Sequence, residues 1–154
     1  MLHQLIYVSK MTTPMPDEDI KSIVESGKYN NHKGYLTGCL IYSNECFMEY
    51  IEGDIFKLNH LFSKISGDHR HKEILLLGLK EISHRLYNNY TLKKYSDHFN
   101  DFPQSVLDEM KPSEYDPFPM SMELAMEYFH FSRFNYPEKP FSHEFPKFES
   151  LKKK

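Results

Sequence analysis

The feature that most constrains the fold is the order in which strand-like and helix-like segments follow one another. The strand-like runs are short, apolar and rich in β-branched or aromatic residues, as buried strands are. They lie at Leu2–Ser9, Tyr35–Ser43, Cys46–Ile51, Ile74–Ile82 and Tyr90–Tyr95. Helix-like segments follow the first run and the third. This order is that of a split βαβ arrangement, so we expect an α+β ferredoxin-like sandwich in which two helices cover one face of a mixed sheet.

Proline, glycine and short polar residues mark where the two helices begin and end. Three consecutive acids follow Pro16, and acids in the first turn of a helix interact favourably with its dipole. We expect the first helix to end at Gly27 or at the Asn30-Asn31 pair, because both residue types are common just past a helix C-terminus. Asp54 is expected to cap the second helix and Gly67 to end it.

The strand-like runs differ in where we expect them to lie. Tyr35–Ser43 and Cys46–Ile51 are separated only by Asn44-Glu45, which predicts a hairpin. Ile74–Ile82 carries so many branched apolar side chains that we expect a central strand rather than one at the surface. Tyr90–Tyr95 predicts a last strand.

The last third of the chain differs in composition from the rest, because prolines divide it into short pieces. We therefore divide the chain into a folded domain, residues 1–100, and a helical extension with a tail, residues 101–154. Ser105–Met110 and Ser121–Phe134 are expected to be helical. The second helix carries too many aromatic residues to stay free, so we expect it to pack on the sheet or on another subunit, which would make a homo-oligomer. From Tyr136 the tail is expected to be extended and only in part ordered.

Composition narrows the class of protein. The chain has 154 residues and a formal net charge of −3, so we expect one domain and no nucleic-acid binding by bulk charge. No window approaches the roughly 20 apolar residues of a membrane span, and the N-terminal apolar stretch is too short for a signal peptide. We therefore expect a cytoplasmic protein that does not engage a membrane. Cys39 and Cys46 lie in apolar segments and are expected to be reduced, with a disulfide as the alternative.

Four polar groups interrupt the apolar patterns, and each has a structural and a functional interpretation. Tyr7 lies in the middle of a strand and is either a core tyrosine or a reactive one. The Asn30-Asn31 pair either caps a helix or binds a ligand. Glu49 lies among apolar strand residues and faces either a solvated edge or a functional site. The cluster Asp68–His71 is either a solvated loop or a group that binds a phosphate or ribityl chain.

Taken in order, these groups and the segments around them form a pattern. The segments LIYVS, NN followed by YLTGCLIYS, FMEYIEG and DHRH resemble the BLUF family of blue-light sensors over roughly the first hundred residues. From Asn31 through Thr37-Gly38 to Glu49 and Glu52-Gly53, the family's spacing is matched without gaps. The resemblance implies a photoreceptor and not an enzyme, with a bound flavin and a downstream protein that reads its state. The implied flavin is FAD, with FMN or riboflavin as alternatives.

The resemblance also implies a role for individual residues around the flavin. Asn31 would hydrogen-bond the polar edge of the flavin ring, and Asn30 is a neighbouring candidate. Asp68 and Arg70 match positions beside the ribityl and phosphate end. The apolar walls would come from Ile23, Leu40 and Phe47.

Glu49 departs from the family, which has glutamine at this position. In the family, light drives electron transfer from a tyrosine, here Tyr7, to the flavin, and protons move through the glutamine, which then changes its hydrogen bonds. An amide has a donor end and an acceptor end, whereas an ionised carboxylate has two equivalent acceptors and cannot donate. A Glu49 protonated through burial would regain a donor. We therefore expect flavin binding to survive and the photocycle to be lost or altered.

Two further positions bear on the output of the site. Tyr90 and Leu92 stand where the family often has tryptophan and methionine, residues implicated in relaying the change in the pocket, so we expect them to act as the signal relay.

Other functions stay open. Glu49 favours a light-insensitive flavin-binding or flavin-free interaction module, whereas a hydrolase of the acylphosphatase kind shares the fold class but would need a glycine-rich phosphate cradle that we do not find.

Overall fold

The computed structural model describes residues 1–43, 45–94, 108 and 121–135, and of residues 26–34 it describes only the backbone. Strands and helices follow one another in the predicted order, with one more helix after the last strand. The elements are β1 (Leu2–Met11), α1 (Asp17–Gly34), β2 (Thr37–Tyr42), β3 (Cys46–Asp54), α2 (Ile55–Ser66), β4 (His71–Glu81), β5 (Tyr90–Lys94) and α4 (Met122–Asn135).

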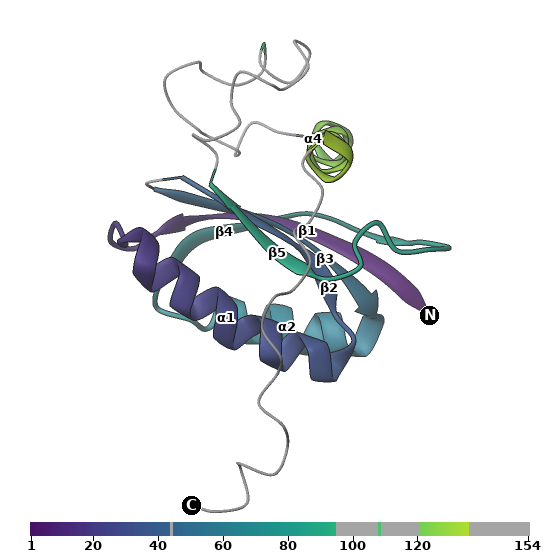
Figure 1. Ribbon diagram of the computed structural model, residues 1–154, viewed down its shortest axis with the longest axis horizontal. Helices are drawn as coiled ribbons and strands as arrows, with labels where there is room; N and C mark the ends of the chain where they lie inside the picture. The colour runs from purple at the N-terminus through teal and green to yellow at the C-terminus, as the bar shows by residue number, and fades with distance from the viewer. Residues whose placement is uncertain (44, 95–107, 109–120, 136–154) are drawn as a thin grey trace, which may run out of the picture.

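The strands form one five-stranded sheet in the order β4-β1-β3-β2-β5. β1 pairs with β3 and β4 in antiparallel fashion, β2 and β3 form the predicted antiparallel hairpin, and β5 lies parallel to β2. The sheet is therefore mixed. α1 and α2 cover one of its faces, and α4 lies on the other (Figure 1). The predicted ferredoxin-like α+β sandwich is confirmed, and β3, at its centre, is the strand that carries Glu49.

Both faces of the sheet bury apolar side chains. Ile20 of α1 and Leu58 of α2 are almost fully buried against the first face. On the second face, Tyr128 and Phe129 of α4 join the core, and the ring of Phe129 lies 5.4 Å from that of Tyr50 on β3. The predicted helix at residues 121–134 thus packs on the sheet. The expected helix at Ser105–Met110, apart from Asp108, and the tail from Tyr136 lie outside the described residues.

The helix ends were predicted in part. Asp54 caps α2 by accepting a hydrogen bond from the backbone N–H of Phe56 at 3.0 Å, and Gly67 follows its last turn, as expected. The prediction that the first helix ends at Gly27 or Asn30-Asn31 is wrong, because α1 continues to Gly34. The helix ends where Tyr35 adopts a left-handed backbone conformation, with φ of 55°, which breaks the helical repeat.

β4 does not occupy the central position that its apolar run suggested. Among the described strands it pairs only with β1 and forms an edge of the sheet, and Leu75, Leu76 and Leu79 are 44%, 44% and 48% exposed. The register between β1 and β4 shifts twice, as expected of an irregular edge strand. The strand contacts α2 on one face and, at Gly78, Met122 of α4 on the other, but in the described part of the chain no strand pairs with its outer side.

Two further expectations concern the cysteines and membranes. Cys39 and Cys46 are buried and form no disulfide, as predicted. Within the part of the chain that the structure describes, no helix has the length and apolar character to cross a membrane.

Candidate functional site

A cavity of about 460 Å³ lies between the sheet and the two helices α1 and α2. Its walls combine apolar side chains from both helices and from the sheet with a smaller set of polar and charged groups. The lining residues are Tyr7, Met15, Ile20, Ser22, Ile23, Val24, Leu40, Phe47, Glu49, Leu61, Lys64, Ile65, Asp68, Arg70, His71 and Tyr90. The cavity is therefore a mostly apolar pocket with a few convergent polar groups, which is the usual composition of a small-molecule site.

Strand alternation explains which side chains reach the cavity. Successive residues of a strand point to opposite faces, so Phe47, Glu49 and Ile51 of β3 face α1 and α2. Tyr50 points to the α4 side. Tyr7 of β1 is the direct partner of Glu49 across the antiparallel pair, which places both side chains on the same face.

Glu49 is the most unusual residue of the cavity, because its carboxyl group is buried and 4% of the residue is exposed. The hydroxyl of Tyr7 donates a hydrogen bond to Oε2 of Glu49, and the hydroxyl of Tyr90 donates to Oε1. One carboxyl group thus lies between two buried phenols that come from different strands. Of the two interpretations of Glu49, the solvated edge is wrong, since β3 is the central strand of the sheet.

Burial controls the protonation of this group. Loss of hydration raises the pKa of Glu49 to about 7, and the hydrogen bonds from Tyr7 and Tyr90 oppose that rise because they stabilise the ionised form. Burial, together with the neighbouring Glu49 carboxylate, raises the pKa of Tyr7 and of Tyr90 well above the usual value of a phenol. Near neutral pH both tyrosines are therefore protonated, while Glu49 is present in both forms.

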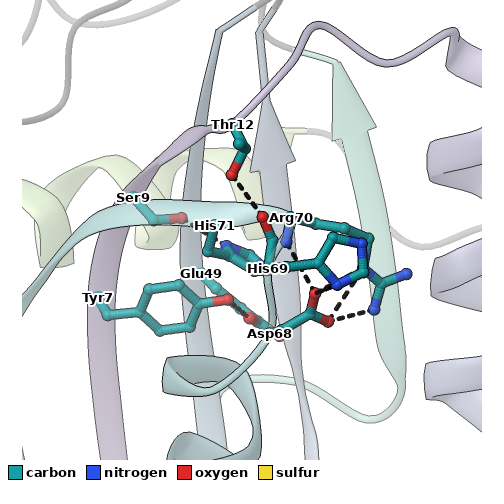
Figure 2. A network of polar contacts seen from close by, with 8 residues as sticks. All are labelled: Tyr7, Ser9, Thr12, Glu49, Asp68, His69, Arg70 and His71. Atoms are coloured by element: carbon teal, nitrogen blue, oxygen red, sulfur yellow. Dashed lines mark hydrogen bonds and ion pairs between the residues drawn. The ribbon is translucent and has the colours of Figure 1, made fainter.

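A second polar group lies in the connection between α2 and β4 (Figure 2). The carboxylate of Asp68 accepts hydrogen bonds from the backbone N–H of Arg70 at 2.9 Å and from its guanidinium, with Nε 2.9 Å from Oδ1. These bonds lower the pKa of Asp68 to about 2. The side chain of Asp68 is 20% exposed and that of His69 is 96% exposed, so only part of the cluster is a solvated loop.

His71 links this connection to the sheet. Its Nδ1 lies 2.8 Å from Oγ of Ser9 (Figure 2). Its ring centroid lies 4.9 Å from that of Phe47. Burial lowers the pKa of His71, which favours the neutral imidazole at physiological pH. His71 thus forms part of the cavity wall between Phe47 and the Asp68–Arg70 pair.

The structure brings most of the residues singled out from the sequence into one cavity. Those that line it are Tyr7, Ile23, Leu40, Phe47, Glu49, Asp68, Arg70 and Tyr90. Leu92 does not line the cavity but packs against the apolar cluster that contains Leu40 and Tyr90. Asn30 and Asn31 belong to α1 rather than following it, and their side chains lie outside the described residues.

Several lining residues were not singled out from the sequence. Leu61, Lys64 and Ile65 share one face of α2, and their spacing was visible as a helical repeat. His71 was part of the polar cluster after α2 but was not separated from His69, which points to solvent. Distinguishing the two histidines requires knowing that β4 begins at His71.

Comparisons with known proteins extend these observations. The family model described as "BLUF: Sensors of blue-light using FAD" matches residues 2–93. The photoactivated adenylate cyclase subunit beta of Euglena longa is 31% identical over 86 residues, which are 56% of this chain and 10% of that protein. The photoactivated adenylate cyclase subunit alpha-like protein FB of Euglena gracilis is 33% identical over 94 residues, 60% of this chain and 9% of that protein. The chain thus spans about a tenth of the length of these curated relatives.

Solved structures share the fold. The ground-state structure of BlsA matches with a TM-score of 0.71 and 18% identity, covering 98% of this chain and 99% of that one. The dark-state structure of BlrB, a BLUF protein, matches with a TM-score of 0.67 and 24% identity, covering 84% and 93%. Klebsiella pneumoniae BlrP1, solved with FMN and cyclic diGMP, matches with a TM-score of 0.56 and 28% identity over 60% of this chain and 25% of that one.

Proposed function

Since the chain belongs to the BLUF family of flavin-binding blue-light sensors, we propose that it is a blue-light receptor whose response depends on the protonation of Glu49. The observation that carries this proposal is the burial of the Glu49 carboxyl group between the hydroxyls of Tyr7 and Tyr90. A buried acid with two phenol partners is a site where the position of one proton changes the hydrogen bonds of the whole group.

The properties of the cavity fit a flavin. Its volume of about 460 Å³ is in the range of small-molecule pockets. Apolar side chains from the helices on one side and from the sheet on the other suit a flat aromatic ring, and two of them are Ile23 and Leu40. Lys64 and Arg70 supply positive charge in the same cavity, which suits a phosphate group.

The residues that would hold the flavin follow from this distribution. Ile23, Leu40 and Phe47 would contact the ring, and Asp68 with Arg70 would bind the ribityl and phosphate end. Asn31, with Asn30 beside it, remains the proposed partner of the polar edge of the ring. We propose FAD as the flavin, with FMN and riboflavin, which share this ring, as alternatives. When bound, the flavin would supply the absorption of blue light and an electron acceptor next to Tyr7.

Tyr7 and Glu49 would then control the movement of protons in the site. In the ionised form of Glu49, both carboxylate oxygens accept hydrogen bonds from tyrosines, and the group has no proton to donate. In the protonated form, one oxygen donates, so one of the two phenol contacts must reverse or break. Only this form offers the donor and the acceptor that the family's glutamine provides.

Because the pKa of Glu49 is about 7, we propose that pH sets the fraction of molecules with an altered photocycle. The test is the absorption spectrum of the purified protein before and after blue light, about one pH unit below and above the pKa of Glu49. We expect a yellow protein without the ordinary reversible red shift, and with a different light response at the two pH values. An ordinary red shift that is the same at both would contradict the proposal.

Glu49→Gln is the matched variant for this test. It keeps the shape of the side chain and restores an amide with distinct donor and acceptor ends. We expect the variant to show the reversible red shift at both pH values if the remainder of the pocket is competent. A yellow variant that still does not respond would assign the defect to another residue of the pocket.

We propose residues 1–100 as the sensor and residues 101–154 as the extension that carries the output to a downstream protein. A contact between β5 and α4 supports this division of roles, because Nζ of Lys93 donates to the backbone oxygen and to Oγ of Ser132, each at 2.8 Å. Tyr90 and Leu92 belong to the same strand as Lys93, so a change at Glu49 would reach α4 through β5. Tyr90 and Leu92 are thus the proposed relay.

A further inference from the structure

A second buried carboxyl group lies on β3, on the face of the sheet that α4 covers. Glu52 has no exposed surface. Its Oε1 accepts from Oγ1 of Thr37 at 2.8 Å and from the backbone N–H of Tyr87 at 2.7 Å. Its Oε2 accepts from the hydroxyl of Tyr50 at 2.9 Å and from the backbone N–H of Leu86 at 2.8 Å. Four donors saturate the acceptor capacity of this carboxylate.

These bonds tie the connection between β4 and β5 to the centre of the sheet. Two of the four donors are consecutive backbone amides of that connection, at Leu86 and Tyr87. The preceding residue, Arg85, adds a second set of bonds, because its guanidinium donates to the backbone oxygen of Glu52 at 3.0 Å and to that of Tyr35 at 2.7 Å. The connection is thus held by a buried anion and by a cation beside it.

The held connection leads directly into the strand that carries Tyr90. The backbone N–H of Gly38 on β2 donates to the backbone oxygen of Asn89 at 3.0 Å, and Gly38 is the partner of Tyr90 in the parallel pair. β5 has only five residues and pairs only with β2 within the described sheet. Lys93 and Lys94 fasten the far end of β5 to α4 and α1, so the connection before β5, together with β2, fixes the end of the strand that carries Tyr90.

We propose that Glu52 is a positioning residue of the light-sensing site, which holds Tyr90 in hydrogen-bonding distance of Glu49 from the opposite face of the sheet. Glu49 and Glu52 lie three residues apart on β3 and point to opposite faces. Glu49 accepts a hydrogen bond from the hydroxyl of Tyr90. Glu52 accepts hydrogen bonds from the backbone of the segment that leads to Tyr90 and so holds that segment in place. This role rests on the proposed function of Glu49 and Tyr90.

A purely structural role of Glu52 predicts something different. Loss of its bonds would then lower the stability of the protein and leave the protonation of Glu49 unchanged. A positioning role predicts that the protonation changes, because the bond from Tyr90 stabilises ionised Glu49 and depends on Glu52. The other titratable groups that line the cavity with Glu49 are Tyr7, Lys64, Asp68, Arg70 and His71.

The experiment is a pH titration of the full chain in which the infrared carbonyl band of protonated Glu49, assigned by its loss in Glu49→Gln, is followed with and without flavin. In Glu52→Gln, we expect the midpoint of this titration to rise by about one pH unit, which corresponds to the loss of one charge-assisted hydrogen bond. We expect the same rise in Tyr90→Phe. The double variant should show no larger rise than Tyr90→Phe alone, because both changes remove the same bond.

Two further variants make the test decisive. Tyr50→Phe removes one bond to Glu52 but leaves both amide bonds of the connection and the bonds of Arg85, so the titration midpoint of Glu49 should not change. Arg85→Gln loosens the connection without touching the Glu52 carboxylate, so the midpoint should rise even if Glu52→Gln does not fold. An unchanged midpoint in folded Glu52→Gln or Arg85→Gln, or a rise that adds to that of Tyr90→Phe, would overturn the proposal.

The titration is independent of light. If Glu49 titrates and responds to Glu52→Gln while blue light has no effect, the proposed photoreceptor function fails and the positioning role stands. If blue light acts as proposed but the midpoint does not move, the positioning role fails alone.

Discussion

The hydroxyl of Tyr90 on β5 donates a hydrogen bond to Glu49 on β3, although β2 lies between the two strands. Tyr7, on β1 at the other side of β3, donates to the second oxygen of the same carboxylate. One buried acid therefore joins side chains from both sides of the central strand. A change in its protonation must alter at least one of these two contacts, because a protonated oxygen no longer serves only as an acceptor.

The stability of the protein should depend on pH through Glu49. Its pKa is raised from 4.5 to about 7, so the folded state holds the proton more tightly than the unfolded state. The protonated Glu49 therefore adds to the free energy of unfolding. This added stability is fully present below about pH 4.5 and is lost as the pH rises through about 7. In urea unfolding, the free energy of unfolding of the wild type should fall by about 3 kcal/mol over this pH interval. That of Glu49→Gln should not show this fall, because the amide does not titrate. Parallel pH profiles of the two proteins would contradict the burial of a titrating acid.

The bond from Tyr90 should lower the pKa of Glu49. Tyr90→Phe removes the hydroxyl and keeps the ring, so the ionised form loses a donor and the pKa of Glu49 should rise above about 7. Infrared titration of the Glu49 carboxyl group measures this directly. Tyr128→Phe is the control, because Tyr128 is also almost fully buried but lies on α4, on the opposite face of the sheet from Glu49 and outside the connection that leads to Tyr90. A similar rise in both variants would point to general loosening of the core.

Sequence patterns predicted the parts of this fold that local order determines. The strand β1, the hairpin of β2 and β3, and the cap at Asp54 all follow from the spacing of apolar and polar residues within one segment. The alternation along β3 also placed Glu49 on the same face as Phe47. What the pattern could not predict is the pairing of strands that no tight turn joins, since that pairing brings together residues far apart in the chain.

Two errors and one omission show where local signals mislead. The apolar run of β4 suggested a central strand, but no strand pairs with its outer side among the described residues. Gly27 and the Asn30-Asn31 pair suggested a helix end, but α1 continues until Tyr35 leaves the helical conformation. The contact between Tyr90 and Glu49 depends on the parallel pairing of β5 with β2, which no local signal in either strand reveals.

Asp68 should have a pH dependence opposite in sign to that of Glu49. Its pKa is lowered from 3.8 to about 2, chiefly by the hydrogen bonds from the guanidinium of Arg70. The ionised Asp68 therefore stabilises the folded state above about pH 3.8, and this stabilisation is lost as the pH falls through about 2. Because the pair is partly exposed, we expect Asp68→Asn to cost about 1–2 kcal/mol at neutral pH and nothing below about pH 2. Urea unfolding at several pH values checks both parts.

The matched control for Asp68 is an exposed ion pair of the same kind. Glu73 lies 2.9 Å from Nζ of Lys10 at the surface, where solvent weakens the attraction. Glu73→Gln should therefore leave the stability unchanged within the error of the measurement. An equal loss in both variants would mean that the contribution of Asp68 does not come from its partly buried pairing with Arg70.

The contact between β5 and the centre of the sheet also requires that β2 approach β3 closely at Gly38. A Cβ atom at this position would lie 1.9 Å from the backbone oxygen of Tyr50, and φ of Gly38 is 158°. Since backbone atoms cannot move aside as a side chain can, Gly38→Ala should separate β2 from β3 and destabilise the protein by more than about 3 kcal/mol. Thermal unfolding measures the loss. The control is Gly67→Ala, in which the new Cβ would lie 3.7 Å from its nearest atom, an ordinary contact. Its thermal stability should therefore be close to that of the wild type. If Gly38→Ala proved equally mild, β2 and β3 would have room to separate, and the position of Tyr90 opposite Glu49 would not depend on their close approach.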